Sequence, residues 1–286
     1  MTDPGDALRA YVKGRLSMGE PEIFVPSGQR EAMLDLARRA VSPTTTERRP
    51  LSEVGRLSAA GTREELLAIP DMASLREVAE GCVRCGLHAT RTRVVFADGP
   101  DSARVLCVGE APGANEDASG VPFVGRAGQL LDRLLRSAGL PRDEVFICNV
   151  LKCRPPGNRN PNPNEIEACS PFLVRQVELV APRVIAAFGT FAAQTLLETR
   201  ESLGRLRGRT HLYRGYPLVV TYHPAALLRN PGWVRPAWED LQRIRTILEG
   251  DAETIADSVD RTPPREPTAS PHFGPEDQLT LGDTDG

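Results

Sequence analysis

Four short apolar runs, separated by segments with helical spacing, constrain the fold of this chain more than any other feature. The runs are RVLCVG (104–109), EVFICNV (144–150), RVIAAFG (183–189) and PLVVTY (217–222). Because they are rich in Val and Ile and show no polar alternation, they predict strands that are buried on both faces. Helices are expected at 126–138, 163–179, 190–197 and 236–248. Strands that alternate with helices favour an α/β fold, in which helices cover both sides of a parallel sheet.

The ends of the chain are expected to differ from this central region. We divide the sequence into an N-terminal extension of short helices and linker (1–70), a globular domain (71–249) and an acidic, disordered tail (250–286). The formal net charge is −3, but the tail holds nine acidic residues against two arginines and the extension holds ten of each sign, so the domain has a net charge of +4. A modestly basic domain is compatible with weak attraction to phosphates.

The cysteines predict a metal or cluster site. No apolar stretch is long enough to span a bilayer and the N-terminus lacks the pattern of a secretory signal, so a cytoplasmic protein is expected. Clustered cysteines in that compartment are more often ligands than disulfides. Four of them form two separated pairs, Cys82-x2-Cys85 and Cys153-x15-Cys169. This spacing suits a tetrahedral zinc ion and a [4Fe–4S] cluster equally well.

Polar residues follow the ends of the predicted strands. Glu110 comes directly after the first run, Asn149 closes the second, and His223 follows the fourth. In an open parallel sheet, ligands bind beyond the carboxyl ends of the strands, so these side chains are expected on one rim. With the ring of Phe123 nearby, an acid, an amide and an imidazole suit a planar polar ring better than a metabolite phosphate.

Four motifs in collinear order carry a resemblance to a known family. They are GEAPG-x2-ED, PFVGRAGQLL, NVLKCRPPGNR and HPAALLR, and with the matching cysteines they span about Ala73 to Glu249. Together they resemble family 4 uracil-DNA glycosylases, the iron–sulfur branch of that superfamily. The resemblance implies a three-layer α/β/α fold with a central four-stranded parallel sheet. It also implies that the four cysteines hold a [4Fe–4S] cluster, with zinc as the less favoured occupant.

The same resemblance implies a reaction and roles for the site residues. The expected activity is monofunctional hydrolysis of the N-glycosidic bond of uracil in DNA, which begins base excision repair of deaminated cytosine. Phe123 would stack on the flipped uracil, Asn149 would bond its O4 and N3 edge, and His223 would stabilise charge on O2. Backbone amides around Glu110 and Ala111 would complete the pocket.

Further residues receive roles in water activation and DNA contact. Glu110 is the first choice for the carboxylate that orients the water, and Asp117 the second. Leu227 is the expected wedge that enters the duplex when the base leaves. Contacts to the phosphate backbone are expected from a further three residues, namely Arg229, Arg154 and Pro155.

Three alternative functions remain to be weighed. A neighbouring branch of the superfamily would act on hypoxanthine or on thymine opposite guanine, but Glu110 and Asn149 argue against the branch that lacks both. A relative that captures DNA covalently needs a histidine in the loop after the second strand, and residues 154–165 contain none. A catalytically silent DNA-binding module is disfavoured by the intact set of site residues.

The expected partner is uracil-containing DNA, single- or double-stranded, and the protein is expected to be a nucleoid-associated monomer. The tail segment Gln278-Leu279-Thr280-Leu281 is similar to part of the bacterial sliding-clamp-binding peptide. Gly282 stands where such peptides often place an aromatic residue, so a chance match is favoured over a weak clamp contact.

Overall fold

The computed structural model describes residues 61–250 and 259, and all of them belong to one compact unit. Residues 1–60 of the N-terminal extension and the clamp-like segment of the tail lie outside the described residues. The packed region extends further toward the N-terminus than residue 71. Helix α4 (Arg63–Leu67) buries Leu66 in the core, with 1% of its surface exposed.

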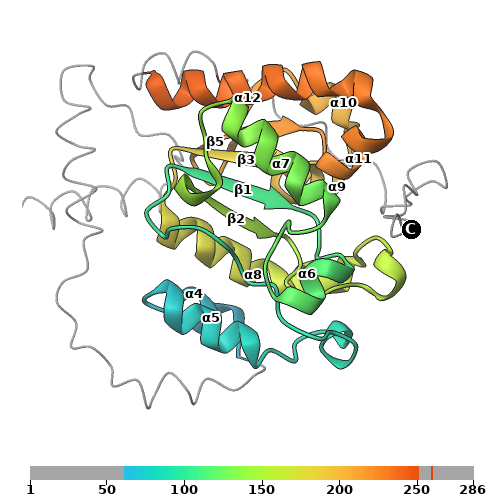
Figure 1. Cartoon of the computed structure of the whole chain (residues 1–286). Helices are drawn as coiled ribbons and strands as arrows, with labels where there is room; N and C mark the ends of the chain where they lie inside the picture. The colour runs from blue at the N-terminus through green and yellow to red at the C-terminus, as the bar shows by residue number, and fades with distance from the viewer. Residues whose placement is uncertain (1–60, 251–258, 260–286) are drawn as a thin grey trace, which may run out of the picture. The chain divides into compact units, whose positions relative to one another are not determined.

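A five-stranded sheet with the order β2-β1-β3-β5-β4 forms the centre of the domain (Figure 1). Four parallel strands match the predicted runs: β1 (Val105–Gly109), β2 (Val145–Asn149), β3 (Val184–Phe188) and β5 (Tyr216–Thr221). The fifth strand, β4 (Thr210–Tyr213), pairs antiparallel with β5 at the edge. The prediction of four strands was therefore one strand short, and the sheet is mixed.

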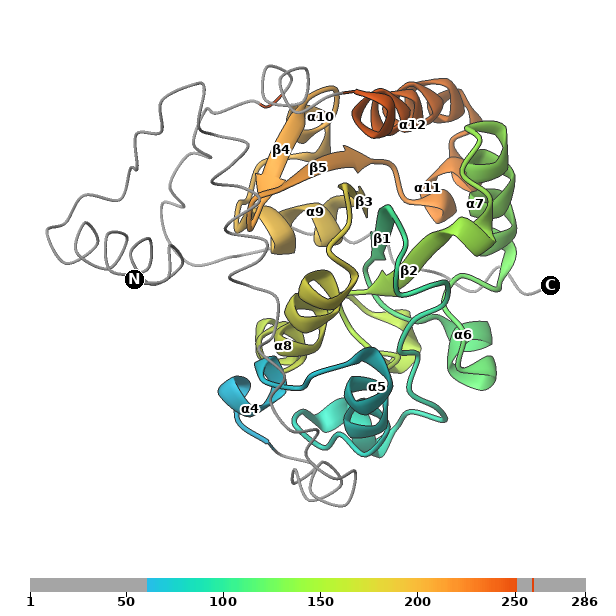
Figure 2. The ribbon, with the colours of Figure 1, turned by 90° about the vertical axis from the view of Figure 1, so that its left-hand side faces the viewer.

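Helices cover both faces of the sheet, as Figures 1 and 2 show from two directions. One face packs against α8 (Pro163–Val180), α9 (Thr190–Leu197) and α10 (Leu203–Leu206), and α4 and α5 (Met72–Glu80) pack in turn against α8. The other face packs against α7 (Arg126–Ser137), α11 (Pro224–Arg229) and α12 (Val234–Glu249). The short helix α6 (Ala114–Ser119) lies in the loop after β1. The expected three-layer α/β/α arrangement is confirmed.

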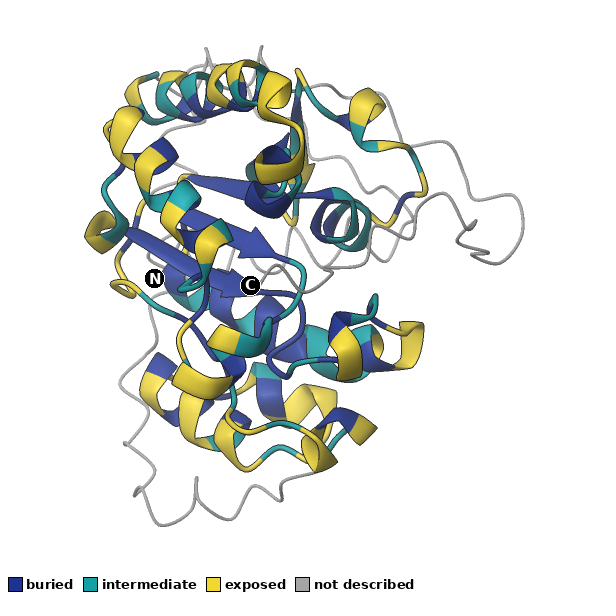
Figure 3. Cartoon of the chain, turned by 45° about the vertical axis from the view of Figure 1, so that its right-hand side comes forward, coloured by how far each residue is buried: buried dark blue, intermediate teal, exposed yellow. Residues whose placement is uncertain are grey.

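Alternation along each strand divides the core into two clusters. In β1, Leu106 and Val108 belong to one cluster, whereas Val105 and Cys107 belong to the other. Both clusters are apolar because both faces of the sheet are covered, which explains why the strands lack polar alternation in the sequence. Figure 3 shows buried strands in dark blue between helices that expose one side.

Short 3-10 turns complete the domain at the points where loops change direction. Their bounds are η1 (Gly86–Ala89), η2 (Arg142–Glu144), η3 (Pro156–Asn158) and η4 (Pro231–Trp233). A stretch from Val95 to Asp98 runs along the outer edge of β2, where Asp98 and Ile147 exchange backbone hydrogen bonds of 2.8 and 2.9 Å. No helix of the described region has the length and apolar character that crossing a bilayer requires.

Candidate active site

Three of the predicted site residues lie around one point at the carboxyl ends of the strands. Gly109 ends β1, and a methyl group on its Cα would come within 2.3 Å of Asn149 Oδ1 and 2.5 Å of Phe123 Cζ. The rings of Phe123 and His223 have their centroids 5.5 Å apart, with a tilt of 32°. An amide, an aromatic ring and an imidazole are thus brought together from three separate segments of the chain. Only glycine fits at position 109 without displacing two of them.

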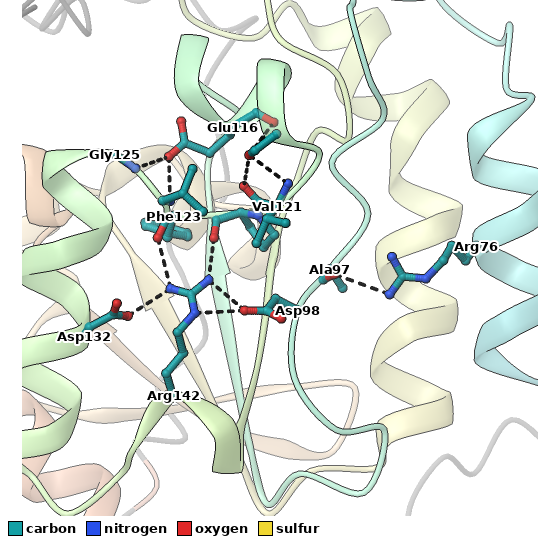
Figure 4. A network of polar contacts seen from close by, with 12 residues as sticks. Arg76, Ala97, Asp98, Glu116, Val121, Phe123, Gly125, Asp132 and Arg142 are labelled. Carbon is teal, nitrogen blue, oxygen red and sulfur yellow. Dashed lines mark hydrogen bonds and ion pairs between the residues drawn. The ribbon is translucent and has the colours of Figure 1, made fainter.

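Phe123 has a backbone conformation that most residues avoid. Its φ angle is 54°, in the left-handed region, which costs roughly 1–3 kcal/mol for a residue with a side chain. Arg142 holds this conformation by donating to the carbonyl oxygens of Phe123 (3.0 Å) and Pro122 (2.6 Å). Ion pairs with Asp98 (2.8 Å) and Asp132 (2.9 Å) fix the guanidinium in turn (Figure 4). Sequence reasoning missed Arg142.

Glu116 organises the other end of the same loop. Its carboxylate accepts hydrogen bonds from the backbone amides of Gly113 (3.1 Å), Val124 (2.9 Å) and Gly125 (3.0 Å). Figure 4 shows this carboxylate above Phe123, with Arg142 on the opposite side. The aromatic ring is therefore carried by a loop with an ionic group at each end, which favours a preformed binding surface.

Asn149 has an unused hydrogen-bonding atom. The residue is 2% exposed, and its Oδ1 atom has no hydrogen-bond partner in the described structure. A buried acceptor without a partner typically costs about 1–3 kcal/mol, so such atoms are rare unless a ligand satisfies them. The Asn149 side chain can therefore accept a hydrogen bond from a ligand that binds beside it.

His223 is held as a neutral imidazole with a defined tautomer. It is the N-cap of α11, and its Nδ1 accepts a hydrogen bond from the backbone amide of Ala225 at 3.2 Å. Because Nδ1 accepts, the proton of the neutral ring is on Nε2, which can donate. Burial, with a smaller effect of Arg229, lowers the pKa of His223 to about 4. The ring packs over Gly189, where a methyl group would lie 3.0 Å from His223 Cβ.

The two candidate carboxylates occupy different environments. Burial raises the pKa of Glu110 to about 7, and within the described residues nothing accepts from the amides of Glu110 and Ala111. Asp117 is 5% exposed and accepts from the amide of Thr92 (2.9 and 3.1 Å) and from that of Arg93 (3.4 Å). The structure thus gives Asp117 a role in holding the preceding loop and does not bring it to the site.

Two of the residues expected to contact DNA are buried. Leu227 is 2% exposed and packs in the core, because the short helix α11 turns it toward the sheet. Its neighbour Leu228 is 38% exposed, and Arg229 is exposed beside it. Pro155 is buried as well, whereas the two residues after it are exposed.

Arg154 also has a structural contact. Its Nε donates to Asn158 Oδ1 at 2.8 Å, which ties the two sides of the loop after β2 together. Asn158 has a φ angle of 52°, so this bond stabilises a tight left-handed turn. Arg154 is half-buried, and the exposed part of the loop is formed by Pro156 and Gly157.

The four paired cysteines line one small cavity beneath the sheet. Cys82 and Cys85 come from the segment after α5, Cys153 from the loop after β2, and Cys169 from α8. Arg91 lies at the same cavity and donates to Cys153 Sγ (3.4 Å) and to the carbonyl of Cys82 (2.7 Å).

Four cysteines around one cavity are a donor set whose chemistry suits a thiolate-bound metal or cluster. Among the described residues, no three Cys, His, Asp or Glu side chains converge on the position of a single ion. The two remaining cysteines, Cys107 and Cys148, are fully buried in the apolar strands β1 and β2. Sulfur ligands joined to three separate segments would pin the region of α5 to the loop after β2.

Comparisons with known proteins agree with this geometry. The family model of the Uracil DNA glycosylase superfamily matches residues 96–242. The chain is 42% identical to the type-4 uracil-DNA glycosylase of Thermotoga maritima over 192 residues, which covers 66% of this chain and 97% of that protein. It is 46% identical to the type-4 enzyme of Pyrobaculum aerophilum over 169 residues (56% and 86%). The type-5 enzyme of the same organism is 32% identical over 148 residues (46% and 65%).

Proposed function

Because the chain belongs to the uracil DNA glycosylase superfamily, we propose that it hydrolyses the N-glycosidic bond of uracil in DNA. The main support for the proposal is that the side chains of Phe123, Asn149 and His223 lie close together at the end of β1. Their chemistry matches the three demands of the reaction, which are a surface for stacking, a pattern for base recognition and a donor for the leaving group. Release of uracil would begin base excision repair of deaminated cytosine.

Base recognition rests on Phe123 and Asn149. A base in the duplex stack is out of reach, so the nucleotide must be flipped out, and the ring of Phe123 offers a surface on which it can stack. The unpaired Oδ1 of Asn149 can accept from N3–H of uracil while Nδ2 donates to O4. Cytosine presents the opposite pattern, with an acceptor at N3 and a donor at N4. The amide therefore selects uracil over the normal base.

Bond breakage leaves negative charge on the base and positive charge on the sugar. Nε2–H of His223 can donate to uracil O2, where the negative charge develops, and the low pKa of the imidazole keeps it neutral at physiological pH. A preorganised donor in a site shielded from water stabilises such charge strongly. The free amides at Glu110 and Ala111 are further donors near the same rim.

Glu110 is the group we assign to water orientation, and its pKa predicts the pH dependence of the reaction. A carboxylate acts on water in its ionised form, so excision by the wild type should rise with pH and level off above about 7. Glu110→Gln should lower the plateau rate by roughly 10²–10⁴ and remove the rise, as measured by single-turnover assays from pH 5 to 9.

Thermal denaturation provides the control for this variant. The folded pKa of Glu110 lies above the ordinary value of 4.5, so ionising the carboxylate destabilises the fold increasingly as pH rises from 4.5 to 7. Glu110→Gln should therefore have a higher Tm than the wild type at pH 8 and a similar Tm at pH 4.5. A variant that kept the wild-type pH–rate profile would contradict the role given to Glu110.

We also propose that Cys82, Cys85, Cys153 and Cys169 bind a [4Fe–4S] cluster. The common cavity, the donor Arg91 at its wall and the similarity to type-4 enzymes support this assignment. Such a cluster would supply structural cross-links among three segments, and no step of the hydrolysis passes through it. The cluster-bound cysteines would hold in place the segment that connects α5 with β1.

The wedge that enters the duplex is reassigned from Leu227 to Leu228. Leu228→Ala should slow excision from double-stranded DNA far more than from single strands, because only the duplex has a stack to hold open. Leu227→Ala is the matched variant, and as a buried truncation it should lower the unfolding free energy by about 2–5 kcal/mol. Equal losses on single and double strands for Leu228→Ala would contradict the assignment.

A glycosylase assay tests the whole proposal. Oligonucleotides that contain uracil, hypoxanthine or thymine opposite guanine should be compared in single- and double-stranded form, with base release followed directly. Release of uracil in preference to the other two bases is expected. Absence of uracil release from the iron-loaded protein would refute the proposal. A heat-stable adduct with DNA would instead indicate covalent capture.

A further inference from the structure

Lys152 lies between the base-recognition residue and the cysteine cavity, and the reaction as derived above does not use it. The residue is 2% exposed. Its Nζ donates to the backbone carbonyl of Asn149 and to Gln176 Oε1, both at 2.6 Å. Gln176 is fully buried on α8, and its Nε2 donates to the carbonyl of Phe96 at 3.1 Å. The ammonium group is thereby fixed on the carbonyl of the residue that recognises uracil.

The same lysine also lines the cysteine cavity. Cys153, one of the four cysteines at that cavity, follows it directly in the chain. One residue thus joins the end of β2 to the cysteine cavity.

The charge of Lys152 has no conventional partner. Within the described residues no Asp or Glu forms an ion pair with it, and both acceptors of its Nζ are neutral oxygens. A buried ammonium group is costly unless an opposite charge lies near it. Thiolates around an occupied cysteine site carry net negative charge and would supply that opposite charge.

From this arrangement, and resting on the proposed function, we propose that Lys152 is a positioning residue that couples occupancy of the cysteine site to uracil binding. Negative charge at the occupied site holds the ammonium group, and the ammonium group holds the carbonyl of Asn149 at the end of β2. The Asn149 side chain is then aligned for the base. Coupling between two sites is reciprocal, so uracil binding stabilises the occupied cysteine site.

The test compares the wild type with Lys152→Met, which keeps the length of the side chain and removes its charge and donors. Free uracil is the first probe, and its affinity should fall about 10–100-fold in the variant. The second probe is an iron chelator, and iron release is followed with and without saturating uracil. Uracil should slow iron release from the wild type and have no effect on release from Lys152→Met.

Two further variants separate positioning from simple loss of stability. Arg175→Met removes a half-buried cation from α8, the helix that also carries Gln176. Arg175 donates to the carbonyl of Ile69 (2.7 Å) and pairs with Glu178 (3.1 Å). Arg175→Met should lower the Tm while uracil still slows iron release. Gln176→Leu keeps Lys152 but removes one acceptor, and it should reduce uracil affinity in the same direction. If Lys152→Met does not load iron, the uracil affinity of Gln176→Leu tests the inference in its place.

Wild-type uracil affinity in Lys152→Met, or iron release that uracil slows as much as in the wild type, would overturn the inference. Failure of the proposed function has a different signature, because the iron-loaded wild type would then not release uracil from DNA. Normal excision by the wild type, together with unchanged uracil binding by Lys152→Met, would refute only the coupling.

Discussion

Replacing His223 by alanine is expected to slow uracil excision by about 10²–10³, while affinity for uracil-containing DNA changes little. The imidazole donates to O2 as charge develops there, so its loss raises the barrier to bond breakage more than it weakens the ground-state complex. Single-turnover excision and fluorescence anisotropy with the same oligonucleotide measure the two quantities. His211→Ala, which removes a half-buried imidazole from β4, is the matched control and should excise at nearly the wild-type rate.

The pH dependence offers a second check on His223. Since burial lowers its pKa to about 4, the imidazole is neutral across the working range and should produce no step in the rate near pH 6.5. The rise that ends near pH 7 belongs to Glu110 and should persist in a slow His223→Ala enzyme. Excision at the wild-type rate by His223→Ala would contradict the role of the imidazole as donor.

Asn149→Asp is expected to have the largest effect on base selection. A site built to bond one pattern of donors and acceptors can reject the wrong base by about 10⁴–10⁵. Aspartate loses the donor to O4 and adds negative charge near the uracil anion, so uracil release should slow by about 10²–10³. It also gains an acceptor for the N4 amino group of cytosine, so the preference for uracil should fall about 100-fold or more.

Competing oligonucleotides with uracil or cytosine at one position measure this preference. Asn162→Asp provides the control, because it makes the same change at the N-cap of α8, in a residue to which no role in base recognition is assigned. It should leave both rates near those of the wild type. An Asn149→Asp enzyme that retained the wild-type ratio of uracil to cytosine release would show that the side chain does not read the base.

The strands of the sheet that are buried on both faces could be predicted from the sequence, whereas the edge strand could not. Strands β1, β2, β3 and β5 are covered on both faces, so their sequences are continuous apolar runs whose ends the structure places within about one residue of the prediction. Strand β4 is a four-residue edge strand with the sequence THLY, in which buried and more exposed positions mix. Such a strand has no distinct apolar signal, and its pairing with β5 depends on the turn at Arg214 and Gly215.

The site shows the same division between what a sequence pattern reveals and what only packing decides. Asn149 and His223 could be found because Asn149 ends one buried strand and His223 follows another. Arg142 and Glu116 could not, because they act on backbone atoms of a loop distant in sequence and their identities do not indicate which carbonyl or amide they will meet. Leu227 and Leu228 are adjacent leucines, and only the phase of α11 decides which of them is buried.

The N-cap role of His223 has a consequence for the choice between a free nucleoside and a DNA strand. The amide of Ala225 fixes the tautomer of the imidazole, and Leu228 and Arg229 lie within one further turn of the same helix. α11 therefore carries the proton donor at one end and the groups expected to contact the strand at the other. A polynucleotide can engage both ends while a nucleoside reaches only the first, so we expect free deoxyuridine to be cleaved far more slowly than the same base in a strand.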